Sequence, residues 1–382
     1  MMRSPVTALS VRKSLASPDT AWRRLILRMV GTGCQSLSQS LPRVYLLVAA
    51  TFGLVGFAYL MLFPCLVLTS GYGLYEVLFT NQSIEWSHVL IWLAIGALSI
   101  LVSYRTFQFR PVLPAGILLN EEKAPSLYEL VKGQLAYYRR TRIDRIIVSN
   151  EFELGILNTP KWAFPVDSTA TLVIGLPLIS SLSVSQFHCA LARRLGQFSK
   201  RYNWLENWLY QLREIWPQYC DRSQKYGSGY QLVEWFFLVY APVYKVVAMP
   251  AARLDELAAD NYAMELFNDE VVLDTITTQT LCDSYLAVRS RPITRNVAVR
   301  SKQSLNELHS GMVSAIRAGL KGEKPEQWLA KTLSAEEQWD DAMPSLARRV
   351  ENIGHTQVRM AANVSESAAN VYLGAIIDHY LG

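Results

Sequence analysis

The sequence has few charged residues for its length, and this bounds its class. Only 18% of the 382 residues are charged, whereas 51% are hydrophobic. A chain this apolar buries a large core and is not disordered. The formal net charge of +5 arises in residues 1–43, where seven Lys and Arg accompany the single acid Asp19, because residues 105–382 carry thirty basic and twenty-nine acidic residues. The main part of the chain therefore gives no reason to expect a nucleic-acid partner.

The sequence also lacks the cysteine and histidine patterns that build disulfide frameworks and many zinc sites. Its five cysteines are an odd number without CxxC spacing, so we expect reduced thiols facing the cytoplasm. No two histidines are four residues apart, and no HExxH motif occurs. The five histidines are His88, His188, His309, His355 and His379.

Charge is absent altogether from two long stretches. No charged residue lies between Val44 and Tyr75, a run longer than the roughly 20 residues that cross a bilayer. A second uncharged run, residues 86–104, is just long enough. We therefore expect a transmembrane hairpin over residues 44–104, with spans at about 44–69 and 86–104; the alternative for each span is a buried core helix.

The basic residues around the hairpin predict its direction. Seven Lys and Arg precede the first span, none lies between the spans, and Arg105 and Arg110 follow the second. The positive-inside rule then places both ends of the chain in the cytoplasm, as in a multi-pass protein of a bacterial inner (plasma) membrane. The basic tail, residues 1–43, is also typical of a mitochondrial transit peptide, so the mitochondrial inner membrane is the alternative. Residues 20–30 fit a helix on anionic lipid or a solvated helix.

The remaining residues, 105–382, read as one cytoplasmic domain of helices with a few short strands. Helical spacing covers residues 126–138, and strands are expected at 143–148 and 170–174. A loop between these strands is marked by Asn158, Pro160 and Pro165. A helix follows, with Ser183 or Ser185 as its cap.

A further long helix is expected over residues 231–266, bent near Pro242 and Pro250. Its apolar half, residues 235–250, is apolar enough to touch the bilayer. Lys245 and Pro242 argue against a third full span.

One block of this domain resembles a known family. Residues Leu172 to Arg213 read LVIGLPLISSLSVSQFHCALARRLGQFSKRYNWLENWLYQLR. The block is similar, without a gap, to the pattern LVxGLPLxxxLSxxQFxAVLAHExGHxxxxHxRxxxWxYxLR of a bacterial branch of the HtpX and CaaX-prenyl-protease family of membrane zinc metallopeptidases. The family's HExGH falls on Arg193, Arg194, Leu195, Gly196 and Gln197.

Three other segments extend the resemblance over roughly residues 105–382. The family's RxxExxAD resembles RLDELAAD at residues 253–260, and its DTHPSLxxRLxxLG resembles DAMPSLARRVENIG at 341–354, with the family histidine replaced by Met343. An Asn-Ala pair on the family's substrate-binding edge strand falls on Glu153 and Leu154.

The resemblance implies a fold that is mainly α with a small β-sheet (α+β): a two-helix transmembrane hairpin followed by a gluzincin-like metallopeptidase domain. In an active member, the residue matching Glu256 binds zinc, and the residue matching Asp260 orients a histidine ligand. Here both histidines and the catalytic Glu are replaced, by Arg193, Gln197 and Arg194. We therefore expect no catalytic residue and no cofactor, zinc being lost.

Glu256, as a remnant of that metal site, would be a buried carboxylate that requires a cation. We expect an ion pair between Glu256 and Arg193, or failing that Arg194, from the facing helix. The alternatives are that both arginines turn toward solvent, or that Cys189 joins Glu256 in a rearranged metal site.

The predicted spans and the replaced zinc positions lead to three hypotheses for the function. The first is an inactive membrane-anchored pseudopeptidase that acts as a binding, regulatory or scaffold protein. Its partners would be membrane lipid and a protein or peptide, such as an active homologous peptidase. The alternatives are a membrane metalloendopeptidase with a rearranged metal site and a structural component of a membrane complex.

Overall fold

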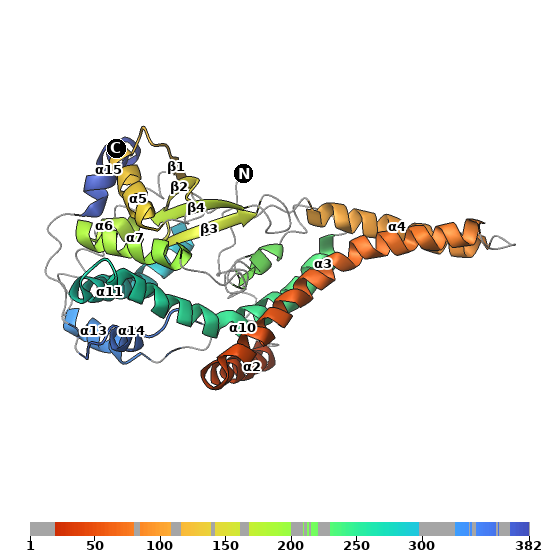
Figure 1. Ribbon diagram of the computed structural model, residues 1–382, viewed down its shortest axis with the longest axis horizontal. Helices are drawn as coiled ribbons and strands as arrows, with labels where there is room; N and C mark the ends of the chain where they lie inside the picture. The colour runs from red at the N-terminus through yellow and green to blue at the C-terminus, as the bar shows by residue number, and fades with distance from the viewer. Residues whose placement is uncertain are drawn as a thin grey trace. The chain divides into compact units, whose positions relative to one another are not determined.

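The fold is mainly helical with a small mixed sheet, as the sequence predicts (Figure 1). The computed structural model describes residues 20–79, 85–107, 116–138, 142–160, 168–199, 209, 212–213, 215–220, 230–297, 325–335, 337, 341–356, 358 and 367–381. The chain divides into two compact units. The first comprises Met1–Leu113, Thr159–Ser168 and Asn203–Ala252, and the second comprises Pro114–Asn158, Thr169–Tyr202 and Arg253–Gly382.

The first unit is built on three helices near the N-terminus, α2 (Thr20–Ser40), α3 (Pro42–Phe79) and α4 (Trp86–Phe107). Helix α3 continues well past residue 69, where the sequence analysis ends the first span. Gly71 and Gly73 do not stop it, because a glycine inside a helix costs only about 1 kcal/mol and α3 packs against α4 along this stretch.

Helices α3 and α4 form the expected hairpin through close contacts at small residues. A Cβ atom added at Gly73 would lie 2.4 Å from a ring carbon of Trp92, and one added at Gly96 would lie 2.8 Å from the Ser70 hydroxyl. Both glycines therefore let the partner helix approach where a larger residue would collide, a common way for helices to pack in membranes.

A third helix, α10 (Tyr230–Met264), is also long and apolar enough to cross a membrane, as α3 and α4 are. As the sequence predicts, one helix runs through both Pro242 and Pro250. From sequence alone, Lys245 and Pro242 argue against a third full span. Length and composition nevertheless make α10 a third candidate span, beside the two that are expected.

Within the first unit, the N-terminal part of α10 runs antiparallel to α3 and is tied to it by tyrosine hydroxyls. The Tyr59 hydroxyl donates to the Leu232 carbonyl at 2.8 Å, and the Tyr45 hydroxyl donates to the Val247 carbonyl at 2.8 Å while accepting from the Ala251 amide at 3.0 Å. A fully buried Trp216, in the short helix η1 (Trp216–Tyr219), packs against these helices. All these cross-links are between neutral groups.

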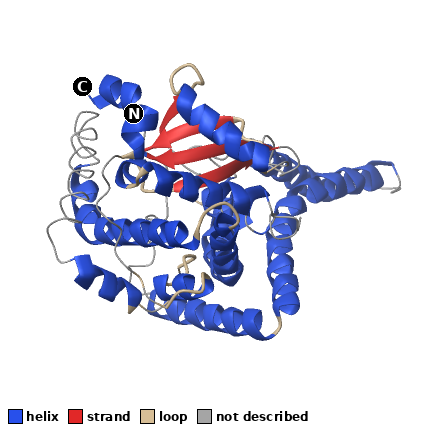
Figure 2. Ribbon diagram, turned by 60° about the vertical axis from the view of Figure 1, so that its left-hand side comes forward, coloured by secondary structure: helices blue, strands red, loops and turns tan. Residues whose placement is uncertain are grey.

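The second unit contains a four-stranded sheet in the order β1-β2-β4-β3, with helices packed against it (Figure 2). The strands are β1 (Gly116–Leu119), β2 (Arg145–Ser149), β3 (Leu154–Pro160) and β4 (Ser168–Gly175). Strand β2 pairs antiparallel with β1 and parallel with β4. Strands β2 and β4 confirm the strands predicted at residues 143–148 and 170–174.

The expected loop at Asn158 and Pro160 is wrong, since both residues belong to β3. Proline is tolerated there because β3 lies at an edge of the sheet and Pro160 is its last residue. Pro165 lies outside the described residues.

Helices complete the second unit: α5 (Pro125–Tyr137), α6 (Leu176–Ser181), α7 (Val184–Ser199), the C-terminal end of α10, α11 (Asp269–Val297), α13 (Pro325–Leu333), α14 (Leu346–Asn352) and α15 (Ala368–Leu381). Helix α7 begins with a capping box. The Ser183 hydroxyl accepts from the Gln186 amide at 3.3 Å, and the Gln186 side chain accepts from the Ser183 amide at 2.9 Å. This reciprocal cap, with Ser183 as one of the two expected residues, fixes the start of the helix that carries Arg193.

Candidate functional site

Helix α7 places Arg193 deep inside the second unit. Its neighbours along the helix, Leu191, Ala192 and Leu195, are fully buried, and the Arg193 residue itself is only 2% exposed. A guanidinium is almost never buried to this extent unless it is paired. The alternative that this arginine turns toward solvent is therefore wrong.

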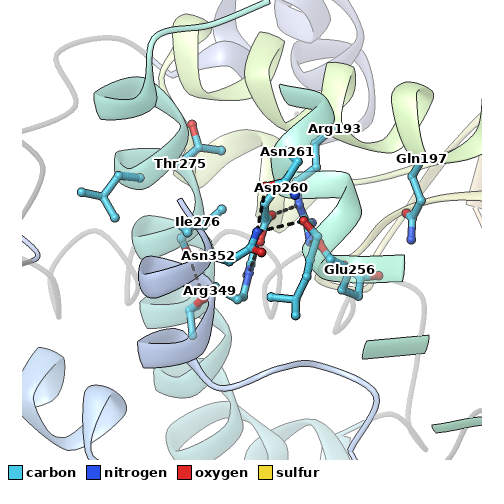
Figure 3. Close-up of polar contacts among 12 residues, drawn as sticks. Arg193, Gln197, Glu256, Asp260, Asn261, Thr275, Ile276, Arg349 and Asn352 are labelled. Carbon is cyan, nitrogen blue, oxygen red and sulfur yellow. Dashed lines mark hydrogen bonds and ion pairs between the residues drawn. The ribbon is translucent and has the colours of Figure 1, made fainter. Parts of the chain in front are cut away.

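The partners of Arg193 are two carboxylates one turn apart on α10. Arg193 Nη2 donates to Glu256 Oε2 at 2.5 Å, and Arg193 Nε donates to Asp260 Oδ1 at 2.5 Å (Figure 3). Glu256 is 8% exposed and Asp260 is fully buried. The ion pair expected between Arg193 and Glu256 is thus present, and the same guanidinium bridges to Asp260 as well.

The second arginine of the pair also reaches Glu256. Arg194 Nη1 lies 2.6 Å from Glu256 Oε1 and also donates to Gln197 Oε1 at 2.9 Å. Both carboxylate oxygens of Glu256 therefore accept a hydrogen bond from a guanidinium. Of the five positions on which the family's HExGH falls, Arg193 and Arg194 bond to this carboxylate, and Gln197 bonds to Arg194.

A third arginine, which the sequence analysis did not identify, completes the cluster from α14. Arg349 Nε donates to Asp260 Oδ2 at 2.9 Å, and Arg349 Nη2 donates to Asp260 Oδ1 at 2.8 Å. This is the bidentate fork that guanidinium and carboxylate form most strongly. Arg349 is only 2% exposed, and its partner lies 89 positions away in the sequence.

The cluster therefore joins three helices with three cations and two anions. Burial alone would lower the pKa of the Arg193 guanidinium, but the adjacent Asp260 and Glu256 carboxylates outweigh it, so the pKa is raised above its usual value. Three arginines and two carboxylates leave one surplus positive charge. It lies at the edge of the cluster nearest solvent, on Arg194, whose side chain is 18% exposed, whereas the Arg193 and Arg349 side chains are nearly inaccessible. Solvent can screen the charge of Arg194 but not the charges of Arg193 and Arg349.

A close helix contact positions the cluster. A Cβ atom added at Gly196 would lie 2.8 Å from the Tyr262 Cβ and 3.1 Å from the Tyr138 hydroxyl. Only glycine lets α7 approach α10 this closely at that point. The Tyr138 hydroxyl, in turn, donates to the Ala192 carbonyl at 3.2 Å.

The other predicted positions lie outside this cluster of contacts. Cys189, one turn before Arg193, is buried, and burial raises the pKa of its thiol to about 11, which disfavours the thiolate that a metal requires. Met343 is 42% exposed. Glu153 accepts from the Ser149 hydroxyl, and Leu154 is the buried first residue of the edge strand β3.

The residues at the positions that the resemblance assigns to zinc do not fit that ion. A guanidinium has no lone pair for a metal, and both Glu256 oxygens already accept from arginines. Within the part of the chain that the structure describes, no three or more His, Cys, Asp or Glu side chains gather as a metal site would require. The arrangement can hold helices together and present one partly exposed cation.

No protein-family model matches this chain, and no curated protein or solved structure is significantly similar to it.

Proposed function

We propose that this chain is a membrane-anchored pseudopeptidase of the HtpX type, which acts as a binding, regulatory or scaffold protein. One observation carries the proposal. The Arg193 guanidinium lies between Glu256 and Asp260, where the sequence resemblance assigns a zinc ligand and its orienting partner. An arginine there substitutes a charge-assisted bridge for a metal bridge.

The chemistry of the cluster also argues against hydrolysis. A metallopeptidase needs a general base beside the metal to take a proton from the attacking water. The residue at that position, Arg194, is a permanent cation bound to Glu256, so it cannot accept a proton. Neither Glu256 oxygen is free for this role, since each accepts from an arginine.

The binding part of the proposal is supported by the sheet. Strand β3 lies at one edge, and an edge strand carries backbone groups with which an extended peptide can pair. A peptide or an unfolded protein segment is therefore the ligand class that a peptidase-like fold without its metal would retain. The candidate membrane helices would anchor the chain in a bilayer.

The test is the metal content of the full-length chain, purified in mild detergent without chelator. We expect far less than one zinc per chain by elemental analysis, and no zinc-dependent cleavage of an unfolded protein substrate. Glu256→Ala is the matched variant, because it removes the one residue that matches a zinc ligand of the family. Stoichiometric zinc in the parent chain that is lost in Glu256→Ala would overturn the proposal and favour a metalloendopeptidase with a rearranged site.

A structural role in a membrane complex is the second candidate, and the extent of exposed apolar surface on α3, α4 and α10 favours it. Co-purification separates the two functions. Partners retained at a fixed ratio to the chain indicate a structural component, whereas capture that an unfolded peptide competes away indicates a binding protein.

A further inference from the structure

Helix α2 has a second apolar face, which no residue in the described part of the chain covers. One face packs within the first unit through Leu27 and Cys34, which are 4% and 8% exposed. The opposite face exposes three large apolar side chains, Leu25, Ile26 and Met29, at 51%, 53% and 62%. A helix that faces water normally carries polar residues at such positions. A cluster of this kind marks an interaction surface.

Every charged residue from Thr20 to Tyr75 is basic. Arg28 lies beside the apolar patch and Arg43 lies just beyond the helix, and both residues are exposed. Helix α2 also contains Arg23 and Arg24, and there is no Asp or Glu from residue 20 to residue 75. An exposed apolar patch with only cations near it complements an anionic lipid surface, where phosphate groups overlie hydrocarbon.

The position of α2 in the first unit points to the same partner. A single residue, Leu41, separates α2 from α3, and α2 packs against α3. The exposed apolar surface of α3 begins at once with Val44 and Leu47, which are 44% and 65% exposed. Because α3 is a candidate span and α2 directly precedes it, α2 would lie at the membrane–water interface.

We propose that α2 is a second membrane anchor, which lies in the headgroup layer of an anionic bilayer with Leu25, Ile26 and Met29 inserted and the arginines at the phosphates. This surface is independent of the proposed pseudopeptidase function. It would fix the rotation and height of the chain at the membrane surface, which a spanning hairpin alone leaves free.

The helix contains its own control. Ser36 lies seven residues after Met29, two turns further along the same face, and is also exposed. The C-terminal half of this face is polar, with Ser36 and Ser40 exposed and the Ser40 hydroxyl bonded to the Ser36 carbonyl. Met29→Asp and Ser36→Asp therefore add the same charge to the same face, but only Met29→Asp places it in the apolar patch.

The test is hydrogen–deuterium exchange of the full-length chain in nanodiscs, made of phosphatidylcholine alone or mixed in equal parts with phosphatidylglycerol. We expect amides of α2 to exchange at least about tenfold more slowly in the anionic discs, and high salt to reduce the difference. Met29→Asp and Arg28→Glu should each abolish most of this protection. Ser36→Asp should leave most of it, and unchanged exchange in α3 would show that each variant remains folded.

Equal exchange of α2 in the two lipids would overturn the proposal, as would equal effects of Met29→Asp and Ser36→Asp. Protection that is absent in both kinds of disc but appears when a second protein is added would assign the surface to a protein partner instead of lipid.

Discussion

Two regions of this chain tie helices together through polar groups, and they use opposite chemistry. In the first unit, Tyr45 and Tyr59 of α3 bond to the backbone of α10, and these bonds are between neutral groups. In the second unit, α7, α10 and α14 meet through three guanidinium groups and two carboxylates. A neutral bond that is lost leaves a hydroxyl-sized vacancy, whereas an ionic partner that is lost leaves a buried charge. The two regions should therefore differ sharply in their response to single substitutions.

The largest effect should come from Asp260, which is fully buried and shared by Arg193 and Arg349. Asp260→Ala leaves these two guanidinium groups near each other with no anion between them. We expect a loss of about 3–5 kcal/mol in the free energy of unfolding, typical of a broken buried ion pair. Chemical denaturation in detergent, followed by circular dichroism, measures it. A loss below about 1 kcal/mol would show that water reaches this cluster.

The next prediction concerns Glu256 and uses a double-mutant cycle. Glu256→Ala alone leaves Arg194 without a carboxylate and leaves Arg193 to share Asp260 with Arg349. Glu256→Ala with Arg193→Met leaves Arg349 with Asp260, and only the rim residue Arg194 lacks a carboxylate. We expect Glu256→Ala to cost about 2–4 kcal/mol and the double variant to cost less, with a coupling of at least 1 kcal/mol. Additive effects in the same denaturation assay would contradict a direct pair.

A steric test in the first unit should have an intermediate effect. Gly73→Val drives a side chain into the Trp92 ring, whereas Gly71→Val meets nothing within 4 Å. We expect Gly73→Val to cost about 1–3 kcal/mol, and Gly71→Val less than 0.5 kcal/mol. Tryptophan fluorescence during thermal unfolding compares the two variants. Similar shifts would mean that α3 and α4 do not pack as described.

The smallest effect should come from the neutral cross-link. Tyr45→Phe removes the hydroxyl that bonds to Val247 and Ala251, and we expect a cost of about 1–2 kcal/mol. Tyr72→Phe, at a residue that is 69% exposed, serves as its control and should change the midpoint of unfolding little. A cost for Tyr45→Phe as large as that for Asp260→Ala would erase the distinction between the two regions.

Much of this arrangement could be predicted from local sequence. The uncharged run after Arg43 and the run from Trp86 indicate α3 and α4, and the Ser183 cap marks the start of α7. The Arg193 pair could be anticipated because a buried Glu256 requires a cation from a facing helix. Each of these inferences needs only the residues of one element or a charge balance between two.

The rest depended on contacts that no local pattern encodes. Arg349 is one of two adjacent arginines in a short helix. The pattern DTHPSLxxRLxxLG, which residues 341–354 resemble, has its arginine at this position, but its pairing with Asp260, 89 positions away, is set by the fold. Strand β1 has only four residues, too few for the alternation of apolar and polar residues that indicates a strand to be recognised. The long helix through Pro242 and Pro250 was predicted, but Lys245 and Pro242 argued against a third span that the length and composition of α10 allow.

The bridging position of Arg193 also constrains how this protein can evolve. Under the proposed relationship to zinc peptidases, a return to metal binding needs histidine at 193 and 197 and glutamate at 194. Arg193→His as a first step removes the cation shared by Glu256 and Asp260, and Arg194→Glu as a first step brings a second carboxylate beside Glu256. We expect both of these intermediates to be less stable than the present chain, with no bound metal to compensate. The cluster therefore opposes a return to metal binding that begins with a single substitution at residue 193 or 194.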